Sequence, residues 1–263
     1  MHEPMVVKGR LYEPHCQNPA RKPKEPGLGE AMEALDVLKL NPHLYELEDD
    51  CLLQLCEAMG TRPIKKDQLI FEKQEEGRNL FIVAKGRVKV HLHDDAGREL
   101  ILVVFGPGDL FGEMALLDDR GRSAAVTAVE SGHLLVLPRA ALEAGIRKHP
   151  DLGLCLLTML SERIRDSNEI IFDLAMRDVV QRLARLLIMH GDDQIPDEHG
   201  NVSLPSLPAQ ASLAARIGSS RETVSRTMAT WRRQGIILTQ DRMICLTPAF
   251  YQRFEGGEET LST

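Results

Sequence analysis

The sequence predicts an α+β fold in which a β-rich domain is followed by a long helix and a smaller helical domain. Apolar residues recur at every second position in short runs through residues 79–138. After Pro138 their spacing becomes helical, and around Gly218 the pattern predicts two short helices joined by a tight turn. A chain of 263 residues is long enough for two domains that each have a hydrophobic core.

The composition is that of an ordinary globular protein, with 43% hydrophobic and 27% charged residues. No apolar run approaches the ~20 residues that span a bilayer, and the N-terminus lacks the apolar core of a secretory signal. A cytoplasmic location without a membrane partner is therefore expected. The net charge of −7 excludes a chain that coats nucleic acid over its whole surface, but it allows one basic face.

Residues 1–34 are rich in proline, glycine and basic side chains, and we expect them to form a flexible N-terminal arm. The first domain is predicted at residues 35–138. It opens with apolar residues at helical spacing, namely Leu44, Leu47, Cys51, Leu52, Leu55 and Met59. Strand-like alternation follows at residues 88–92 and 100–104 around a turn at 94–97, which indicates an antiparallel sandwich or roll.

Residues 139–177 are predicted to form a long helix. Its apolar positions include Leu152, Leu156, Met159, Ile170 and Leu174. A helix of this length is unusual in a compact domain unless part of it packs on a partner. A symmetric seam between two copies of the chain explains it, although the heptads are imperfect.

Residues 178–251 are predicted to form the second domain, with a short tail at 252–263. Here Leu213, Ala214 and Ile217 give one helix an apolar face, and Gly218 stands where a C-terminal cap is expected. Ser219 or Ser220 can cap the next helix, and the pattern from Ser219 to Glu222 resembles a capping box. Residues 191–210 and 235–248 read as a loop or β-wing.

The second of these two helices has one buried and one charged face. Val224, Met228 and Trp231 recur at buried spacing, whereas the opposite face near its N-terminus carries Ser220, Arg221, Glu222, Ser225 and Arg226. Arginine can donate two hydrogen bonds to guanine, and glutamate can accept one from cytosine. This arrangement predicts a recognition helix for double-stranded DNA. The alternative is a helical hairpin with a solvated charged face.

Two motifs together carry a family resemblance. The stretches "FGEMALL" and "RSAAV", within residues 111–126, and "SSRETVSR" at residues 219–226 resemble the cAMP receptor protein/FNR (Crp/Fnr) family of bacterial transcription regulators over about residues 35–250. The resemblance implies a double-stranded β-roll sensor of the cyclic-nucleotide-binding type, a dimerisation helix and a C-terminal winged helix-turn-helix. It also implies a homodimer that works with RNA polymerase.

In members that bind cyclic nucleotides, the first motif is a phosphate-binding cassette. Carried over, Glu113 would hold the ribose, Arg122 and Ser123 the cyclic phosphate, and the backbone from Gly112 through Met114 to Ala115 the same anion. Arginine suits a buried phosphodiester anion, and a glycine lets the backbone approach the ligand. A Thr-Ser pair that meets the adenine in cAMP-responsive members is replaced here by Ser167 and Asn168.

Several alternatives stay open at this stage. Glu113 and Arg122 could pair with each other in a sensor that binds no ligand, and cyclic di-GMP competes with cAMP as the nucleotide. A cyclic-nucleotide-binding module acting on a protein partner, or a redox or gas sensor on the same scaffold, would use the first domain differently. Ligand binding is expected to control DNA binding allosterically, with a coupling of roughly 1–3 kcal/mol.

On the DNA side, the resemblance implies an inverted pair of TGTGA-type half-sites. No metal is expected. Cys16, Cys51 and Cys56 do not have the spacing of an iron-sulfur cluster, and Cys51, Cys155 and Cys245 lie among apolar residues that predict burial. His91 and His93 alternate on one face of a strand and are expected to be exposed strand histidines; a metal or haem role is the alternative. No catalytic motif is found, so an enzyme is not expected.

Overall fold

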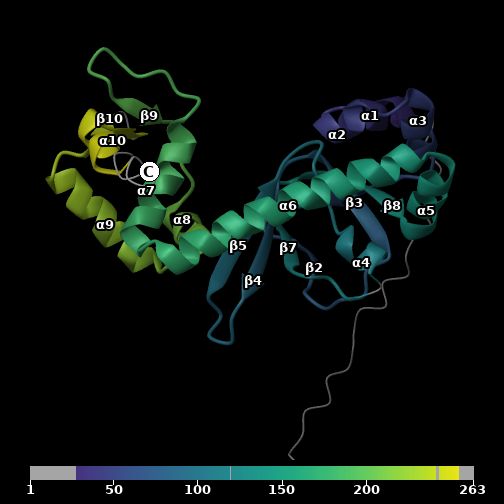
Figure 1. Cartoon of the computed structure of the whole chain (residues 1–263), viewed down its shortest axis with the longest axis horizontal. Coiled ribbons are helices and arrows are strands. Elements are labelled where there is room, and N and C mark those ends of the chain that lie inside the picture. Colours follow the sequence, from purple (N-terminus) through teal and green to yellow (C-terminus); the bar gives the residue numbers. More distant parts are fainter. Residues whose placement is uncertain (1–27, 119, 241–242, 255–263) are drawn as a thin grey trace, which may run out of the picture.

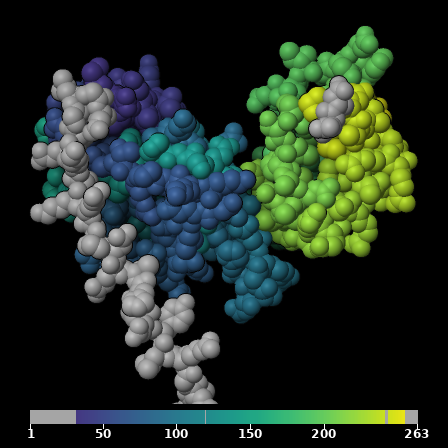
Figure 2. All heavy atoms as spheres, turned by 180° about the vertical axis from the view of Figure 1, so that it is seen from behind, coloured from purple at the N-terminus to yellow at the C-terminus, as the bar shows by residue number. Residues whose placement is uncertain are grey.

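The computed structural model describes residues 28–118, 120–240 and 243–254 of the chain. Two lobes, visible from behind in Figure 2, are bridged by one long helix, α6 (Pro150–Met176), which Figure 1 shows. The arrangement confirms the predicted α+β fold of a double-stranded β-roll, a long helix and a winged helix-turn-helix.

Eight strands of the described part of the chain build the β-roll as two four-stranded antiparallel sheets. The strands run in the order β1–β8–β3–β6 in one sheet and β2–β7–β4–β5 in the other. Their bounds are β1 (Gly60–Ile64), β2 (Leu69–Phe71), β3 (Asn79–Lys85), β4 (Val88–His93), β5 (Glu99–Phe105), β6 (Leu110–Phe111), β7 (Ala125–Ala128) and β8 (Gly132–Pro138). Between the sheets lies an apolar core around Phe71, Phe81 and Phe111, with the Phe81 and Phe111 rings stacked at 5.2 Å between centroids.

Helices cover the outer face of the β1–β8–β3–β6 sheet. These are α1 (Leu28–Leu38), α2 (Pro42–Tyr45), α3 (Asp49–Glu57), α5 (Arg139–Lys148) and the N-terminal half of α6. Leu52 and Leu152 from the helices share one core with Leu80 and Leu137 from the sheet. A short helix, α4 (Met114–Leu117), follows β6.

The second lobe packs helices around a small three-stranded antiparallel sheet of order β10–β11–β9. Its elements are α7 (Val179–Gly191), β9 (Val202–Leu204), α8 (Gln210–Arg216), α9 (Arg221–Arg233), β10 (Ile237–Gln240), β11 (Met243–Leu246) and α10 (Pro248–Phe254). Trp231 and Phe250 meet edge to face in its core, with 5.3 Å between centroids. The β10–β11 hairpin occupies the predicted wing.

Three predicted boundaries differ from the structure. The arm was predicted to end at residue 34, yet α1 begins at Leu28, because Ala34 and Leu38 are buried in the helical core and the helix extends toward the N-terminus. Residues 1–27 lie outside the described residues. The single helix at 139–177 is two helices, since Pro150 cannot continue α5 and disfavours helical backbone at His149. The second lobe continues past 251, because Phe254 at the end of α10 packs on Trp231.

Candidate functional site

A cavity of about 490 Å³ lies between the β-roll and α6. This volume falls within the ~300–1,000 Å³ range of small-ligand sites. Residues of β4 and β5 form one wall, the segment from β6 to β7 forms another, and α6 closes the third side. The lining residues are Phe71, Val90, Leu100, Leu102, Val103, Phe105, Phe111, Gly112, Glu113, Met114, Ala115, Arg122, Ser123, Ala124, Val126, Arg163, Asp166, Ser167, Ile170, Ile171 and Leu174.

Arg122 places a buried cation at this cavity, with only 5% of the residue exposed. Its Nη1 donates to the Gly112 carbonyl at 2.6 Å and its Nη2 to the Asn79 carbonyl at 2.9 Å. The guanidinium also lies over the Phe71 ring, 4.3 Å from its centroid. Among the described residues it makes no ion pair. Desolvation lowers the pKa of Arg122 from its ordinary value, but an arginine stays protonated at neutral pH, so the positive charge is available to an anion.

Two glycines make room for this arginine. Gly112 has a φ of +84°, which favours glycine, and a Cβ placed there would lie 2.5 Å from Arg122 Nη1. A Cβ on Gly77 would lie 2.9 Å from Arg122 Cζ. At both positions the backbone lies so close to the guanidinium that a side chain would collide with it.

Glu113 is buried to the same extent as Arg122, but the two do not pair. Glu113 Oε1 instead accepts from Nη1 of Arg163 on α6 at 2.6 Å. The other carboxylate oxygen, Oε2, is buried and has no hydrogen-bond partner among the described residues. The open alternative of a Glu113–Arg122 ion pair is therefore wrong, and each of the two side chains keeps binding capacity for a further group.

Arg163 belongs to the site although the sequence analysis missed it. Besides Glu113, it donates to the Leu110 carbonyl and lies over Phe105, 4.9 Å from the ring centroid. The signal was available in the sequence: Arg163 precedes Ser167 by four residues, so the two share one helix face. The Ser167 hydroxyl donates to the Arg163 carbonyl at 2.7 Å.

The structure brings all but one of the predicted ligand residues to the cavity. Gly112, Glu113, Met114, Ala115, Arg122, Ser123 and Ser167 all line it. Asn168 does not line the cavity of its own chain. It projects from α6 between Ile164 and Ile171, on a face that the β-roll does not cover.

That uncovered face of α6 carries an apolar stripe, called the outer stripe below. Four of its residues are each about 60% exposed, namely Leu154, Leu157, Ile164 and Ile171. Together with Ser161 and Asn168 they form a series in which three- and four-residue steps alternate, the spacing of a heptad seam. Leu152, Leu156 and Met159, which the sequence analysis assigned to the helix pattern, are instead buried against the β-roll. The helix therefore has two apolar faces: the inner one is buried within the chain, whereas the outer stripe stays exposed, although Ile171 at its end also lines the cavity.

The second lobe presents the predicted helix-turn-helix. Gly218, with φ of +61°, ends α8, and the amide of Ser219 donates to the Ala214 carbonyl at 2.9 Å, a bond typical of a Schellman cap. Ser220 caps α9 by accepting from the Thr223 amide at 3.2 Å. The cap is thus Ser220 with Thr223, and the capping box from Ser219 to Glu222 is not formed.

The two faces of α9 are as predicted. Val224, Met228 and Trp231 are buried in the core of the lobe. The exposed residues near its N-terminus are Ser220, Arg221, Glu222, Ser225 and Arg226. Neither Arg221 nor Arg226 makes an ion pair with another described residue, so both guanidinium groups are available to a partner.

Two side chains of the cavity wall lie next to the helix-turn-helix. Leu100 on β5 and Leu174 on α6 both line the cavity. A Cβ placed on Gly218, in the turn between α8 and α9, would lie 3.1 Å from Leu174 and 3.7 Å from Leu100. The cavity wall therefore lies next to the turn that precedes α9.

Neither a larger hollow nor the cysteines offer a stronger candidate. The hollow, about 730 Å³, is lined by charged groups that pair with one another, such as Arg78 with Glu76 and Arg139 with Glu143. Cys51, Cys56, Cys155 and Cys245 are free and buried, as predicted for three of them. Burial raises the pKa of Cys56 and of Cys155 to about 11, which suppresses the reactive thiolate. Cys16 lies outside the described residues.

A β-roll with a ligand-sized cavity, tied by a long helix to a helix-turn-helix domain, defines the class of transcription regulators controlled by a sensor domain. Residues 61–149 match the cyclic nucleotide-binding domain family, and residues 181–249 match the Crp-like helix-turn-helix domain family. The chain belongs to the Crp/Fnr family of transcription regulators. Members of this family are regulators rather than enzymes.

Known relatives span most of the chain. The cyclic AMP receptor protein of Thermus thermophilus is 34% identical over 172 residues, which cover 64% of this chain and 74% of that protein. The CRP-like cAMP-activated global transcriptional regulator of Mycobacterium tuberculosis is 27% identical over 201 residues, 76% of this chain and 90% of that protein.

A solved structure shares the fold at lower identity. The c-di-GMP-responsive global regulator CLP of Xanthomonas campestris has a TM-score of 0.67 and 21% identity, with 76% of this chain and 99% of that chain covered. In the described part of the chain, no helix has the length and apolar character needed to cross a membrane.

Proposed function

We propose that this regulator is a homodimer whose binding to palindromic DNA is controlled by a cyclic nucleotide, with cAMP as the ligand. One observation carries the proposal. A buried cation, Arg122, and a buried carboxylate oxygen, Glu113 Oε2, line the same cavity; among the described residues the guanidinium makes no ion pair, and Glu113 Oε2 accepts no hydrogen bond. A cyclic nucleotide supplies both missing partners, a phosphate anion and a ribose hydroxyl.

Each part of the ligand has matching chemistry in the cavity. Glu113 Oε2 would accept from the ribose 2′-hydroxyl, and the Arg122 guanidinium would hold the phosphate together with Ser123. Arg163 orients Glu113 through the other carboxylate oxygen. The apolar side chains of Val90, Leu102 and other residues along β4 and β5 suit the faces of a base. The relatives named for cAMP support this choice of ligand.

The outer stripe would form the dimer seam. Exposed leucine and isoleucine at heptad spacing on a 27-residue helix are typical of a two-stranded coiled coil. A second copy of the chain would bury this stripe. Asn168 does not line the cavity of its own chain, but in the dimer it would lie near the cavity of the partner chain. Ligand bound beside Ser167 would then contact the seam as well as the β-roll.

Control of DNA binding would follow from packing. A nucleotide in the cavity would press on Leu100 and Leu174, which lie beside the Gly218 turn, and on α6, which would set the spacing of the two recognition helices in a dimer. A coupling of roughly 1–3 kcal/mol is required, and DNA must tighten nucleotide binding by the same factor.

A nucleotide screen tests the sensing half of the proposal. At a hundredfold excess over its dissociation constant, cAMP should stabilise the protein by roughly 2.7 kcal/mol. For a chain of this size, that corresponds to a rise in Tm of roughly 5–10 °C. The measurement is a thermal melt with cAMP, cGMP or cyclic di-GMP, and 5′-AMP is the control because it lacks the cyclic phosphodiester. A shift with cyclic di-GMP alone would reassign the ligand, and no shift with any of them would overturn nucleotide sensing.

Substitutions in α9 test the DNA-reading half. Arg221→Ala or Arg226→Ala should weaken binding to a TGTGA palindrome by roughly 1–3 kcal/mol, about 5- to 150-fold, since each loses a guanine contact. Fluorescence anisotropy with specific and scrambled duplexes measures the change. The control is Arg233→Ala, an exposed arginine at the other end of α9. Equal losses on both duplexes would mark phosphate contacts instead of base reading.

A further inference from the structure

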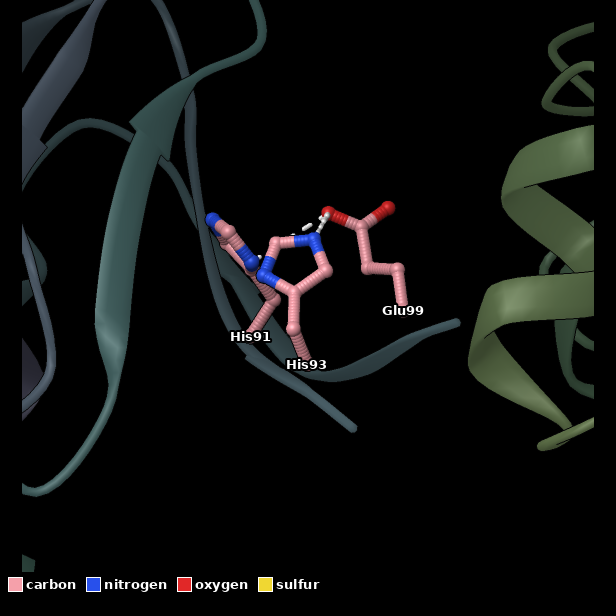
Figure 3. Close-up of side chains that lie close together, drawn as sticks. All are labelled: His91, His93 and Glu99. Carbon is pink, nitrogen blue, oxygen red and sulfur yellow. Dashed lines mark ion pairs between the residues drawn. The ribbon is translucent and has the colours of Figure 1, made fainter. Parts of the chain in front are cut away.

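Two histidines and a glutamate converge on the outer face of the β4–β5 hairpin, away from the ligand cavity (Figure 3). His93 on β4 stands directly opposite Glu99 on β5, and His91 lies two residues earlier on the same face of β4. None of the three lines the cavity. They therefore form a separate constellation, which the proposed function does not use.

The spacing of their donor atoms fits a single small cation. Two ligands of a tetrahedral zinc ion, each at 2.0–2.2 Å from the metal, lie about 3.3–3.6 Å apart. His91 Nδ1 and Glu99 Oε1 are 3.2 Å apart, and His93 Nε2 lies 3.9 Å from the same oxygen. All three donor atoms lie within 4.8 Å of one another. Rotation of the half-exposed His93 side chain closes the remaining gap.

His91 is the anchor of this cluster and differs from its sequence-based expectation. It is expected to be an exposed strand histidine, yet it is only 3% exposed, with the His93 ring 4.8 Å away between centroids. Its Nε2 is hydrogen-bonded to the Thr127 hydroxyl at 2.9 Å, which fixes the ring and directs Nδ1 toward Glu99. Nδ1 is fully buried and makes no hydrogen bond, despite the carboxylate oxygen nearby. Bonds of this kind from the far ring nitrogen commonly orient histidine ligands of metals.

A lysine holds the position that a cation would occupy. Lys89, two residues before His91 on the same face of β4, places its Nζ 2.5 Å from Glu99 Oε1. The ammonium already neutralises the carboxylate. A metal ion must displace it, so Lys89 competes with the metal for Glu99.

We propose that His91, His93 and Glu99 form a binding site for a divalent transition-metal ion of the zinc type, with water completing the coordination. Two imidazoles and one carboxylate are a donor set that zinc accepts with one position left open. The ion would bridge β4 and β5. Since α8 of the second lobe packs against β5, the metal would brace the hairpin at the junction of the two lobes.

Metal titration of the full-length, chelator-treated protein tests this site. Co²⁺ should bind one ion per chain with the visible absorption of a four-coordinate nitrogen and oxygen site, and calorimetry with Zn²⁺ gives the affinity. His93→Gln and Glu99→Gln should each weaken binding at least about tenfold. Lys89→Met should tighten it, because the competing ammonium is gone. His133→Gln, which removes an exposed strand histidine of the other sheet, is the matched control and should change nothing.

The Lys89→Met result separates a metal site from damage to the fold, because a misfolded variant cannot gain affinity. Binding that survives both His93→Gln and Glu99→Gln would overturn the proposal. Thiolate charge-transfer absorption in the cobalt spectrum would also overturn it by assigning the ion to cysteines. An absence of stoichiometric binding would show that the cluster is a histidine-lysine-glutamate ion pair and nothing more.

Discussion

Arg122→Met should abolish measurable cyclic nucleotide binding while leaving the ligand-free protein folded. The guanidinium is the buried cation nearest the proposed phosphate, and removal of one member of a buried charge pair costs about 2–5 kcal/mol of binding. That range corresponds to a loss of roughly 30-fold to several thousand-fold in affinity. Isothermal calorimetry with cAMP on the wild type and the variant measures the change directly.

The same substitution should not lower the Tm of the ligand-free protein by much, and it can raise it. A buried guanidinium without an ion pair carries a desolvation cost, which an apolar side chain of similar length does not. The substitution also removes the hydrogen-bond donor of the Gly112 and Asn79 carbonyls, which offsets part of this stabilisation. Arg120→Met is the matched control, since Arg120 is exposed and lies outside the cavity lining. Unchanged nucleotide affinity in Arg122→Met would remove this arginine from the site.

Local patterns predicted the elements, because these depend on short-range signals, whereas the seven cavity residues named in advance came from the family resemblance. Alternation marked β4 and β5, and Gly218 with the following serines marked the turn into α9. The glycine at 112 is predicted to let the backbone approach a ligand, and the structure shows that with a φ of +84° it makes room for the Arg122 guanidinium. Such features are readable because each residue's role follows from its immediate neighbours in the chain.

What could not be predicted depends on residues distant in the sequence. Glu113 pairs with Arg163, 50 residues away; the four-residue spacing to Ser167 indicates the helix face of Arg163, but no local pattern indicates Glu113 as its partner. His91 alternates with apolar residues like any strand residue, so its burial could not be predicted. In the fold it is 3% exposed and hydrogen-bonded to Thr127 on the neighbouring strand β7. The start of α1 was missed because its helical pattern adjoins a proline-rich arm and its partner is α3.

The two faces of α6 show the same limit. Periodicity predicted a long apolar helix, but it could not separate the leucines that pack on the chain's own β-roll from those left for a partner. Once Leu152 and Leu156 are assigned to the inner face, the remaining stripe keeps a regular heptad that the mixed pattern had obscured. Asn168 within that stripe is then a polar residue of the kind that fixes register in a two-stranded coiled coil.

Ile164→Asp should therefore convert the protein to a monomer and weaken its binding to a palindromic site by roughly a hundredfold or more. A carboxylate in the middle of the outer stripe would face its own copy across the seam, and burying the two like charges is strongly unfavourable. A monomer engages only one half-site, so it loses the gain of about 10²–10⁴ in affinity that two linked binding units provide. Sedimentation velocity gives the oligomeric state, and anisotropy with full and half palindromes gives the affinities.

The matched control is Met189→Asp on α7, because Met189 is 61% exposed where Ile164 is 62% exposed, and both lie on helices. This variant should stay dimeric and bind DNA normally. A half palindrome should bind the Ile164→Asp variant and the wild type with similar affinity, since the recognition helix is untouched; this separates loss of the dimer from damage to the DNA-binding lobe. If Ile164→Asp stays dimeric, the outer stripe is not the seam, and Asn168 has no route to a neighbouring cavity.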